Sequence, residues 1–159
     1  MVKILVVYHS VTGNTARLAQ AVAEGAGRVA QVELRRVDEV SNDDLLMADG
    51  IIVGSPTYFG QMSAEIKALF DASNTVYGRL DGKVGAAFTT TGAAGCGTET
   101  TLLSILTAML IAGMVVRGYS TGGVPCLGAF AIGAPAADAL GSAREMGARI
   151  AALTRQLDG

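Results

Sequence analysis

The residues best suited to chemistry lie in a short loop, Ser10 to Thr15, between an apolar run and a helical pattern. Five of its six residues carry a hydroxyl or amide group or are glycine, and the loop contains neither Lys nor Arg. Backbone N–H groups at a helix start, hydroxyl groups and the positive end of the helix dipole can together hold a phosphate dianion. Neutral donors of this kind suit a terminal monophosphate. The other interpretation is an ordinary strand-to-helix turn with a threonine cap.

Two further loops have compositions that suit a planar ligand. Ser55 to Met62 contains a proline, two aromatic residues, Gly60 and polar side chains. This mixture suits a flat, partly polar heterocycle, because glycine lets the backbone approach it closely and aromatic rings can pack on it. Thr90 to Gly97 is rich in glycine, and its N–H groups can meet the carbonyl oxygens of such a ligand. The alternatives are aromatic residues that belong to the core and a glycine-rich segment that is only a flexible connection.

Several other chemistries are excluded by residues that the sequence lacks. No G-K-[ST] motif is present, which excludes the common ATP loop, and no G-x-G-x-x-G follows the first apolar run, which disfavours a nicotinamide-dinucleotide site. A receiver domain would need an acceptor Asp where this chain has Gly54-Ser55-Pro56. The first loop contains no nucleophilic Cys, and the single histidine disfavours a nucleophilic triad. Cys96 and Cys126 lack metal-ligand spacing, so we expect reduced thiols and no metal site.

Composition bounds the class of protein. The chain has 159 residues, half of them hydrophobic, which is enough for one domain over residues 1–159 without disulfides. Its net charge of −2 provides no basic surface for nucleic acid. The longest apolar stretch, Leu106 to Val116, is far shorter than the roughly 20 residues that cross a bilayer, and no cleavage site follows the apolar start. We therefore expect a cytoplasmic protein without a membrane span or a nucleic-acid partner.

Hydrophobic patterns predict five strands. Three continuous apolar runs indicate strands buried on both faces, one alternating run indicates an edge strand, and one short run ends the series. In chain order the strands are Lys3 to Tyr8, Val32 to Val37, Gly50 to Gly54, Val84 to Thr89 and Met114 to Arg117.

Helical periodicity occupies the segments between the strands. We expect helices from Ala16 to about Gly25, from an N-cap at Ser63, from an N-cap at Thr98 to about Ala112, and over Leu140 to Leu157 after an irregular stretch ending at Pro135. Strands that alternate with helices predict an α/β fold, a doubly wound five-stranded parallel sheet of order 2-1-3-4-5 with helices on both faces. Ligands bind such sheets at the carboxyl ends of the strands, where the three loops lie.

The helix expected from Thr98 to Ala112 has apolar residues around most of its circumference. One sheet face cannot cover such a helix, so a second subunit must bury part of it. We therefore expect a homo-oligomer.

These motifs resemble those of a known family. Ser-x-Thr-Gly-Asn-Thr after the first strand resembles the phosphate loop of flavodoxins, while Ala48 to Met62 and Thr91-Gly92 resemble WrbA-type NAD(P)H:quinone oxidoreductases of the flavodoxin-like superfamily. The similarity spans nearly the whole chain and implies a flavodoxin-like fold with non-covalently bound FMN. It also implies a homodimer or a homotetramer. Carried over by position, it assigns residues to the phosphate, to the isoalloxazine ring and to its pyrimidine edge. These are Ser10, Thr12, Gly13, Asn14 and Thr15 for the phosphate; Pro56, Thr57, Tyr58, Phe59 and Gly60 for the ring; and Thr90, Thr91, Gly92 and Gly95 for the edge.

The chain also departs from that family. WrbA-type proteins are longer, have Arg where this chain has Tyr58, and have two histidines where it has Ile111 and Ala112. Three functions therefore stay open. In the first, NAD(P)H reduces bound FMN, which reduces a quinone or similar acceptor without a catalytic side chain. The second is an electron carrier between redox proteins, and the third is an interaction module without FMN.

Overall fold

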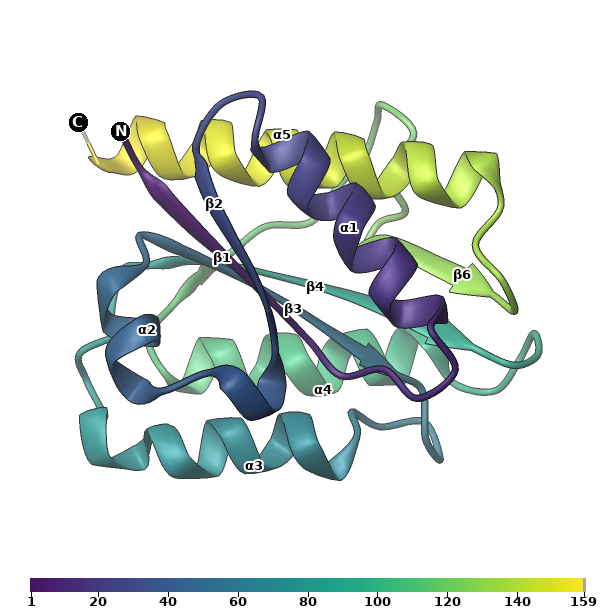
Figure 1. Ribbon diagram of the computed structural model, residues 1–159, viewed down its shortest axis with the longest axis horizontal. Helices are drawn as coiled ribbons and strands as arrows, with labels where there is room; N and C mark the ends of the chain where they lie inside the picture. The colour runs from purple at the N-terminus through teal and green to yellow at the C-terminus, as the bar shows by residue number, and fades with distance from the viewer. Residues whose placement is uncertain (159) are drawn as a thin grey trace.

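The computed structural model describes residues 1–158 and has a parallel sheet at its centre (Figure 1). Five strands follow the order β2-β1-β3-β4-β5, and a sixth strand, β6, pairs with β4. Every pair of these strands is parallel. The strands are β1 (Lys3–Tyr8), β2 (Gln31–Arg36), β3 (Gly50–Pro56), β4 (Val84–Thr91), β5 (Val115–Val116) and β6 (Phe130–Ile132). The predicted doubly wound order is confirmed.

Helices cover both faces of the sheet (Figure 1). On one face lie α1 (Asn14–Ala26) and α5 (Ala137–Asp158), and on the other lie α2 (Asn42–Met47), α3 (Ala64–Ala72) and α4 (Thr98–Ile111). Short 3-10 turns, η1 (Val37–Glu39) and η2 (Ser73–Val76), follow β2 and α3. Successive residues of β1 enter opposite cores, with Ile4 and Val6 in one cluster and Leu5 and Val7 in the other. This explains the continuous apolar pattern of the strand.

Two glycines let α1 and α5 pack with their backbones in contact. A Cβ atom on Gly25 would collide with the backbone of Arg144, and one on Gly147 would collide with the carbonyl of Val22. The contact fixes α1 against α5, and therefore fixes the loop from which α1 starts.

The predicted fifth strand is present, but it is shorter than expected and is not the last strand. Instead of one strand over Met114 to Arg117, β5 has two residues, and the stretch expected to be irregular up to Pro135 contains β6. The chain leaves the sheet after β5 and returns to pair Phe130 with Thr89. Because β6 supplies a second neighbour there, β4 continues beyond the expected Thr89 to Thr91. The carboxyl end of β4 is thus held from both sides.

Helix starts were predicted less accurately than helix positions. Ser63 caps α3 as expected, its Oγ accepting from the N–H of Ile66. Thr98, expected to cap α4, is instead its first residue; the cap is Gly97, at a φ of 96°. Gly97 is required because a Cβ there would come within 2.6 Å of the Cα of Gly60.

The start of α1 and the presence of α2 also differ from expectation. Helix α1 begins at Asn14, two residues before the predicted start. The six-residue α2 was not predicted; its capping box pairs Ser41 with Asp44.

Among residues 1–158, no helix combines the length and apolarity required for a membrane span. Within the same range, no three His, Cys, Asp or Glu side chains form a group that could hold a metal ion. Cys96 and Cys126 are free and exposed.

Candidate functional site

The carboxyl ends of β1, β3 and β4 meet around a cavity of about 270 Å³. Its walls come from the three loops that the sequence singled out, and none of the lining residues is charged. The lining residues are Val11, Thr12, Asn14, Thr15, Pro56, Thr57, Tyr58, Thr90, Thr91 and Gly92.

The side chain of Ser10 holds the first loop in its conformation. Its buried Oγ accepts hydrogen bonds from the N–H groups of Gly13 and Ala16, both at 3.2 Å. Gly13 adopts a φ of 94°, a left-handed conformation that favours glycine. Among residues 1–158, the N–H groups of Asn14 and Thr15 have no protein acceptor. The positive end of α1 therefore keeps two donors for a ligand.

The second loop is a tight hairpin between Tyr58 and Gln61. Each residue donates its N–H to the carbonyl of the other, at 3.1 and 3.0 Å. Phe59 and Gly60, at the tip, both have positive φ, as in a type I′ turn. A left-handed conformation costs a residue such as Phe59 roughly 1 kcal/mol. The Phe59 side chain is fully exposed and does not line the cavity.

The third loop contributes its first part only. Thr91 and Gly92 line the cavity, whereas Gly95 does not and has open space around it. Farther along, Gly97 lies against the backbone of Gly60, which joins the third loop to the second. The two loops therefore hold each other in place.

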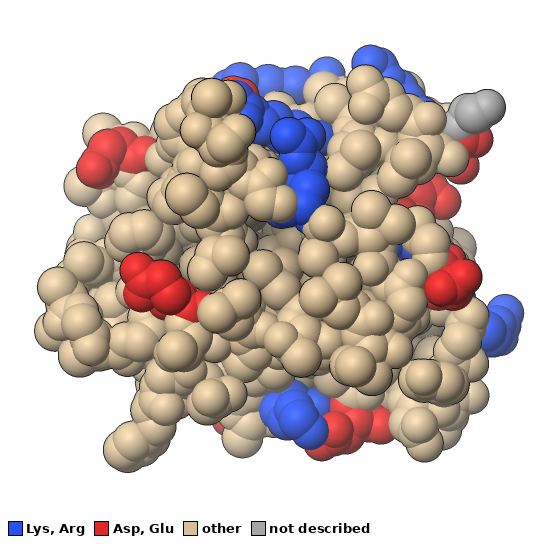
Figure 2. Space-filling view, turned by 180° about the vertical axis from the view of Figure 1, so that it is seen from behind, with Lys and Arg blue, Asp and Glu red and all other residues tan. Residues whose placement is uncertain are grey.

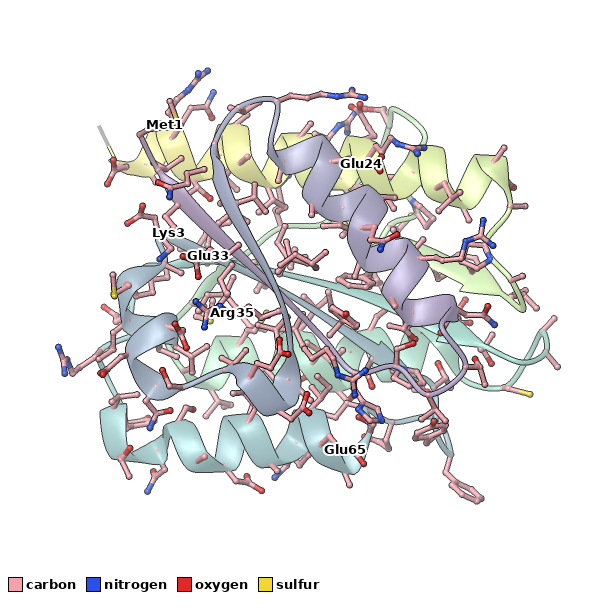
Figure 3. All side chains as sticks on the ribbon, in the orientation of Figure 1. Met1, Lys3, Glu24, Glu33, Arg35 and Glu65 are labelled. Atoms are coloured by element: carbon pink, nitrogen blue, oxygen red, sulfur yellow. The ribbon has the colours of Figure 1, made fainter. Side chains whose placement is uncertain are left out.

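A contact between His9 and Glu65 flanks the first loop. His9, the residue before Ser10, places its Nε2 3.5 Å from a carboxylate oxygen of Glu65 in the first turn of α3. Figure 3 shows Glu65 at the start of that helix, away from Lys3, Glu33 and Arg35. A hydrogen bond from its own backbone N–H, helped by the charge of His9 and by Ser63, lowers the pKa of Glu65. The carboxylate therefore stays charged and faces His9.

Nine of the predicted site residues line one cavity, and five do not. Those outside the lining are Ser10, Gly13, Phe59, Gly60 and Gly95. Sequence reasoning missed two residues of this region. Val11 lines the cavity, and its only signal was its place between two predicted residues. Thr89 has a fully buried hydroxyl that donates to the carbonyl of Ser55 at 2.7 Å and lies 3.0 Å from Oγ1 of Thr57. No signal in the sequence marked Thr89, because it falls at the end of an apolar strand pattern.

Comparisons with known proteins agree with this geometry. The model of a family described as NADPH-dependent FMN reductase matches residues 2–123. A flavodoxin of Aquifex aeolicus is 42% identical over 123 residues, covering 76% of this chain and 66% of that protein. An NAD(P)H dehydrogenase (quinone) of Archaeoglobus fulgidus is 35% identical over 192 residues, covering 99% of this chain and 100% of that protein.

Solved structures give the same result. A flavodoxin, WrbA-like protein from Agrobacterium tumefaciens superposes with a TM-score of 0.85 at 32% identity, covering 98% of this chain and 99% of the other. A flavodoxin from the domain Archaea superposes with a TM-score of 0.79 at 27% identity, covering 96% and 99%. Both solved chains are aligned almost from end to end.

Proposed function

Because the chain belongs to the NADPH-dependent FMN reductase family, we propose that it is an FMN-dependent oxidoreductase that uses NAD(P)H to reduce quinones or similar small acceptors. One observation carries the proposal. The cavity at the carboxyl ends of the strands is walled by the three loops, contains hydroxyl and amide donors, and has no charged lining residue. A phosphate dianion and an uncharged planar ring both suit such a lining.

The residues present fit FMN from one end to the other. Thr12 and Thr15, with the N–H groups of Asn14 and Thr15, would hold the phosphate, while Ser10 and Gly13 keep the loop in shape. Pro56 to Tyr58 would line the isoalloxazine ring, with the backbone of Phe59 and Gly60 at its side. Thr91 and Gly92 would face the pyrimidine edge, with Gly95 farther along the same loop. When bound, FMN supplies hydride and single-electron transfer, and the protein supplies binding and orientation.

No side chain of the cavity is required as a general acid or base. The lining contains no His, Asp, Glu, Lys or Cys, and the nearby His9 faces Glu65. The role of these residues is to bind the cofactor, orient it and leave one side open to a small acceptor.

A second candidate function is electron transfer between redox proteins. The 42% identical relative from Aquifex aeolicus is named a flavodoxin. The alignments with the NAD(P)H dehydrogenases from Archaeoglobus fulgidus and Acidithiobacillus ferrooxidans extend over 192 and 201 residues, so those proteins contain segments that this 159-residue chain lacks. Because of this difference in length, electron transfer between redox proteins stays open as the competing function.

An anaerobic titration separates the two functions. The FMN-loaded protein is titrated with NADPH and then with NADH while the flavin absorbance is followed, and a quinone is added afterwards. We expect rapid bleaching by a nucleotide and recovery of the absorbance with the quinone. No reaction with either nucleotide, together with a long-lived one-electron-reduced flavin under dithionite, would support the carrier. Failure to retain FMN would overturn the site assignment.

We propose that a second copy of the chain covers α4. Three large apolar side chains of this helix are exposed, Leu103 by 46%, Leu110 by 56% and Ile111 by 70%. Glu99 is the one charged residue of α4, and Figure 2 shows a broad surface with charged side chains mainly at its margins. Two copies can meet through an uncharged surface without burying unpaired charges, so a second copy fits it.

Light scattering coupled to gel filtration tests this interface with a matched pair of variants. Leu110→Lys should shift the protein towards the monomer of 16.2 kDa. Leu157→Lys on α5, where the leucine is equally exposed at 56%, should leave the oligomer intact. A wild-type protein that is monomeric at all concentrations would contradict the proposal.

The cytoplasmic location stays a prediction.

A further inference from the structure

Thr90 connects all three loops of the cavity. Its Oγ1 lies 2.7 Å from Oγ1 of Thr15 in the first turn of α1, and its carbonyl accepts the N–H of Thr57 at 2.7 Å. Thr15 and Thr90 are 75 residues apart in the chain, and both are buried, with exposures of 2% and 6%. A single residue of β4 thus contacts the first loop through its side chain and the second through its backbone.

We propose that Thr90 is a positioning residue that turns the hydroxyl of Thr15 into a hydrogen-bond donor for the phosphate of FMN, an inference that rests on the proposed function. The hydroxyl of Thr15 carries one hydrogen, and the oxygens of a phosphate dianion only accept. Thr15 can therefore donate to the phosphate only if its hydrogen is not given to Thr90. The 2.7 Å contact then requires Thr90 to donate and Thr15 to accept.

The position of Thr90 is rigid enough for this role. Its backbone lies between two parallel neighbours, with Pro56 of β3 on one side and Ala131 of β6 on the other. Its hydroxyl hydrogen is used by Thr15, so it is not available to the ring. Thr90 thereby acts on the phosphate end of the cofactor through Thr15, whereas the resemblance assigned it to the pyrimidine edge.

In a chain of two hydrogen bonds, the bond from Thr90 to Thr15 also strengthens the bond from Thr15 to the phosphate. When Thr15 accepts from Thr90, its own O–H becomes more polarised and a better donor. Bonds to charged groups are stronger than bonds between neutral groups, so this polarisation acts where it matters most, at the phosphate. The contribution of Thr90 should therefore depend on the phosphate being present.

Binding of FMN and riboflavin, measured by flavin fluorescence, tests the inference, because riboflavin lacks the phosphate. The variants are Thr90→Val, which removes the hydroxyl while keeping the shape, and Thr90→Ser, which keeps the hydroxyl. Thr15→Val and the double variant complete a cycle. Thr89→Val is the matched control, since it removes a buried hydroxyl from the adjacent position of β4 that contacts Ser55 and Thr57 and does not contact Thr15.

For Thr90→Val we expect FMN binding to weaken about tenfold, as for a lost hydrogen bond to a partner that itself binds a charge, and riboflavin binding to stay unchanged. Thr90→Ser should bind both flavins like the wild type. In the Thr15→Val background, Thr90→Val should cause no further loss. Thr89→Val should leave the ratio of FMN to riboflavin affinity unchanged, even if it lowers the unfolding temperature.

Two results would overturn the inference. Equal losses for FMN and riboflavin in Thr90→Val would place Thr90 at the ring, and a loss that persists in the Thr15→Val background would separate Thr90 from Thr15. Failure of the proposed function looks different. If the wild-type protein binds FMN tightly but does not react with NAD(P)H, the oxidoreductase function is contradicted and the inference about Thr90 stands. If it binds neither flavin, both are contradicted.

Discussion

The two ends of the sheet carry hollows of similar size and opposite chemistry. The cavity at the carboxyl ends of the strands has a volume of about 270 Å³, and the one at their amino ends about 250 Å³. Hydroxyl groups and backbone N–H groups face the first, whereas Asp49, Asp81, Lys83 and Asp158 are among the residues that line the second. Charge alone would favour the amino end as the binding site.

Hydrogen bonding reverses that choice. Lys83 donates from Nζ to the carbonyls of Leu46 and Ala48, and Asp49 accepts the N–H of Lys3 at 2.7 Å. These charged groups already serve the fold, because Lys83 ties the start of β4 to the end of α2 and Asp49 ties the start of β3 to the start of β1. At the carboxyl end, the N–H groups of Asn14 and Thr15 have no protein acceptor within residues 1–158. A binding site is thus recognised by donors that the fold does not use.

The ion pairs near the amino end follow the same rule. Lys3, Glu33 and Arg35 lie close together on β1 and β2 (Figure 3), with Glu33 2.8 Å from Lys3 and 2.9 Å from Arg35. Asp44, 3.4 Å from Arg35, completes a cluster of two cations and two carboxylates, and Lys3 and Arg35 together lower the pKa of Glu33. Such partly exposed pairs position the edge strand and contribute little to stability individually.

The largest effect is expected from a negative charge placed at the carboxyl end. Thr12→Asp changes an exposed side chain of the first loop, so the fold should be unaffected. Its carboxylate would repel the phosphate of FMN, and we expect an affinity loss of about 100-fold, or roughly 2.7 kcal/mol. Fluorescence titration measures the loss. Thr12→Asn is the neutral control, and riboflavin binding should not change. Equal FMN affinities for the two variants would contradict the proposal that the phosphate binds at this loop.

The next effect is expected at the amino end, and on stability alone. Lys83→Met would leave the carbonyls of Leu46 and Ala48 without their donor, lowering the free energy of unfolding by about 2 kcal/mol. Denaturant titration measures this loss, and FMN affinity should stay unchanged. Lys67→Met is the control, because the exposed pair of Lys67 with Asp71 should contribute under about 0.5 kcal/mol. A large loss of FMN affinity in Lys83→Met would break the distinction between the two ends.

The smallest effect at neutral pH is expected from a buried hydroxyl group that has no hydrogen-bond partner. Among residues 1–158, the hydroxyl of Tyr119 is the one buried side-chain nitrogen or oxygen without a hydrogen-bond partner. Tyr119→Phe should therefore stabilise the protein by about 1 kcal/mol at pH 7. A destabilised variant would show that this hydroxyl has a partner in solution.

The same tyrosine predicts a pH dependence. Burial raises the pKa of Tyr119 to about 12, above the usual value of 10.0. The folded protein retains the proton of Tyr119 to a higher pH than the unfolded chain does. The free energy of unfolding of the wild type is therefore undiminished below pH 10 and falls as the pH rises towards 12, by up to about 2.7 kcal/mol. Thermal unfolding between pH 9 and 12 should therefore show a widening gap between Tyr119→Phe and the wild type. A constant gap would contradict the raised pKa.

The sequence predicted the parts of the fold that long patterns encode. The apolar runs of β1, β3 and β4 and the periodicity of the helices were sufficient for the order of the first five strands. The short apolar run of β5 was sufficient for its place but not for its two-residue length. The three-residue β6 has no pattern of its own, and its position depends on pairing with the carboxyl end of β4. Helix α2 did have a local signal, since Ser41 and Asp44 stand at the spacing of a capping box.

The site was predictable as three loops but not as a network. The sequence indicated which residue types meet, because parallel strands end at one edge. It did not indicate that Thr90 would contact Thr15, nor that Gly97 would lie against Gly60, since both contacts join distant segments. The outward position of Phe59 follows from the tight turn between Tyr58 and Gln61, which the resemblance alone did not reveal.

Amide chemical-shift mapping tests the central claim most directly, because it observes both ends of the sheet in one experiment. The ¹H–¹⁵N spectrum of the protein is recorded while FMN is added. The largest changes should occur at the amides of residues 12–15, 57–60 and 91–92, with those of residues 81–84 at the amino end unchanged. Changes concentrated at residues 81–84, or none at the first loop, would contradict the conclusion that donors unused by the fold define the binding site.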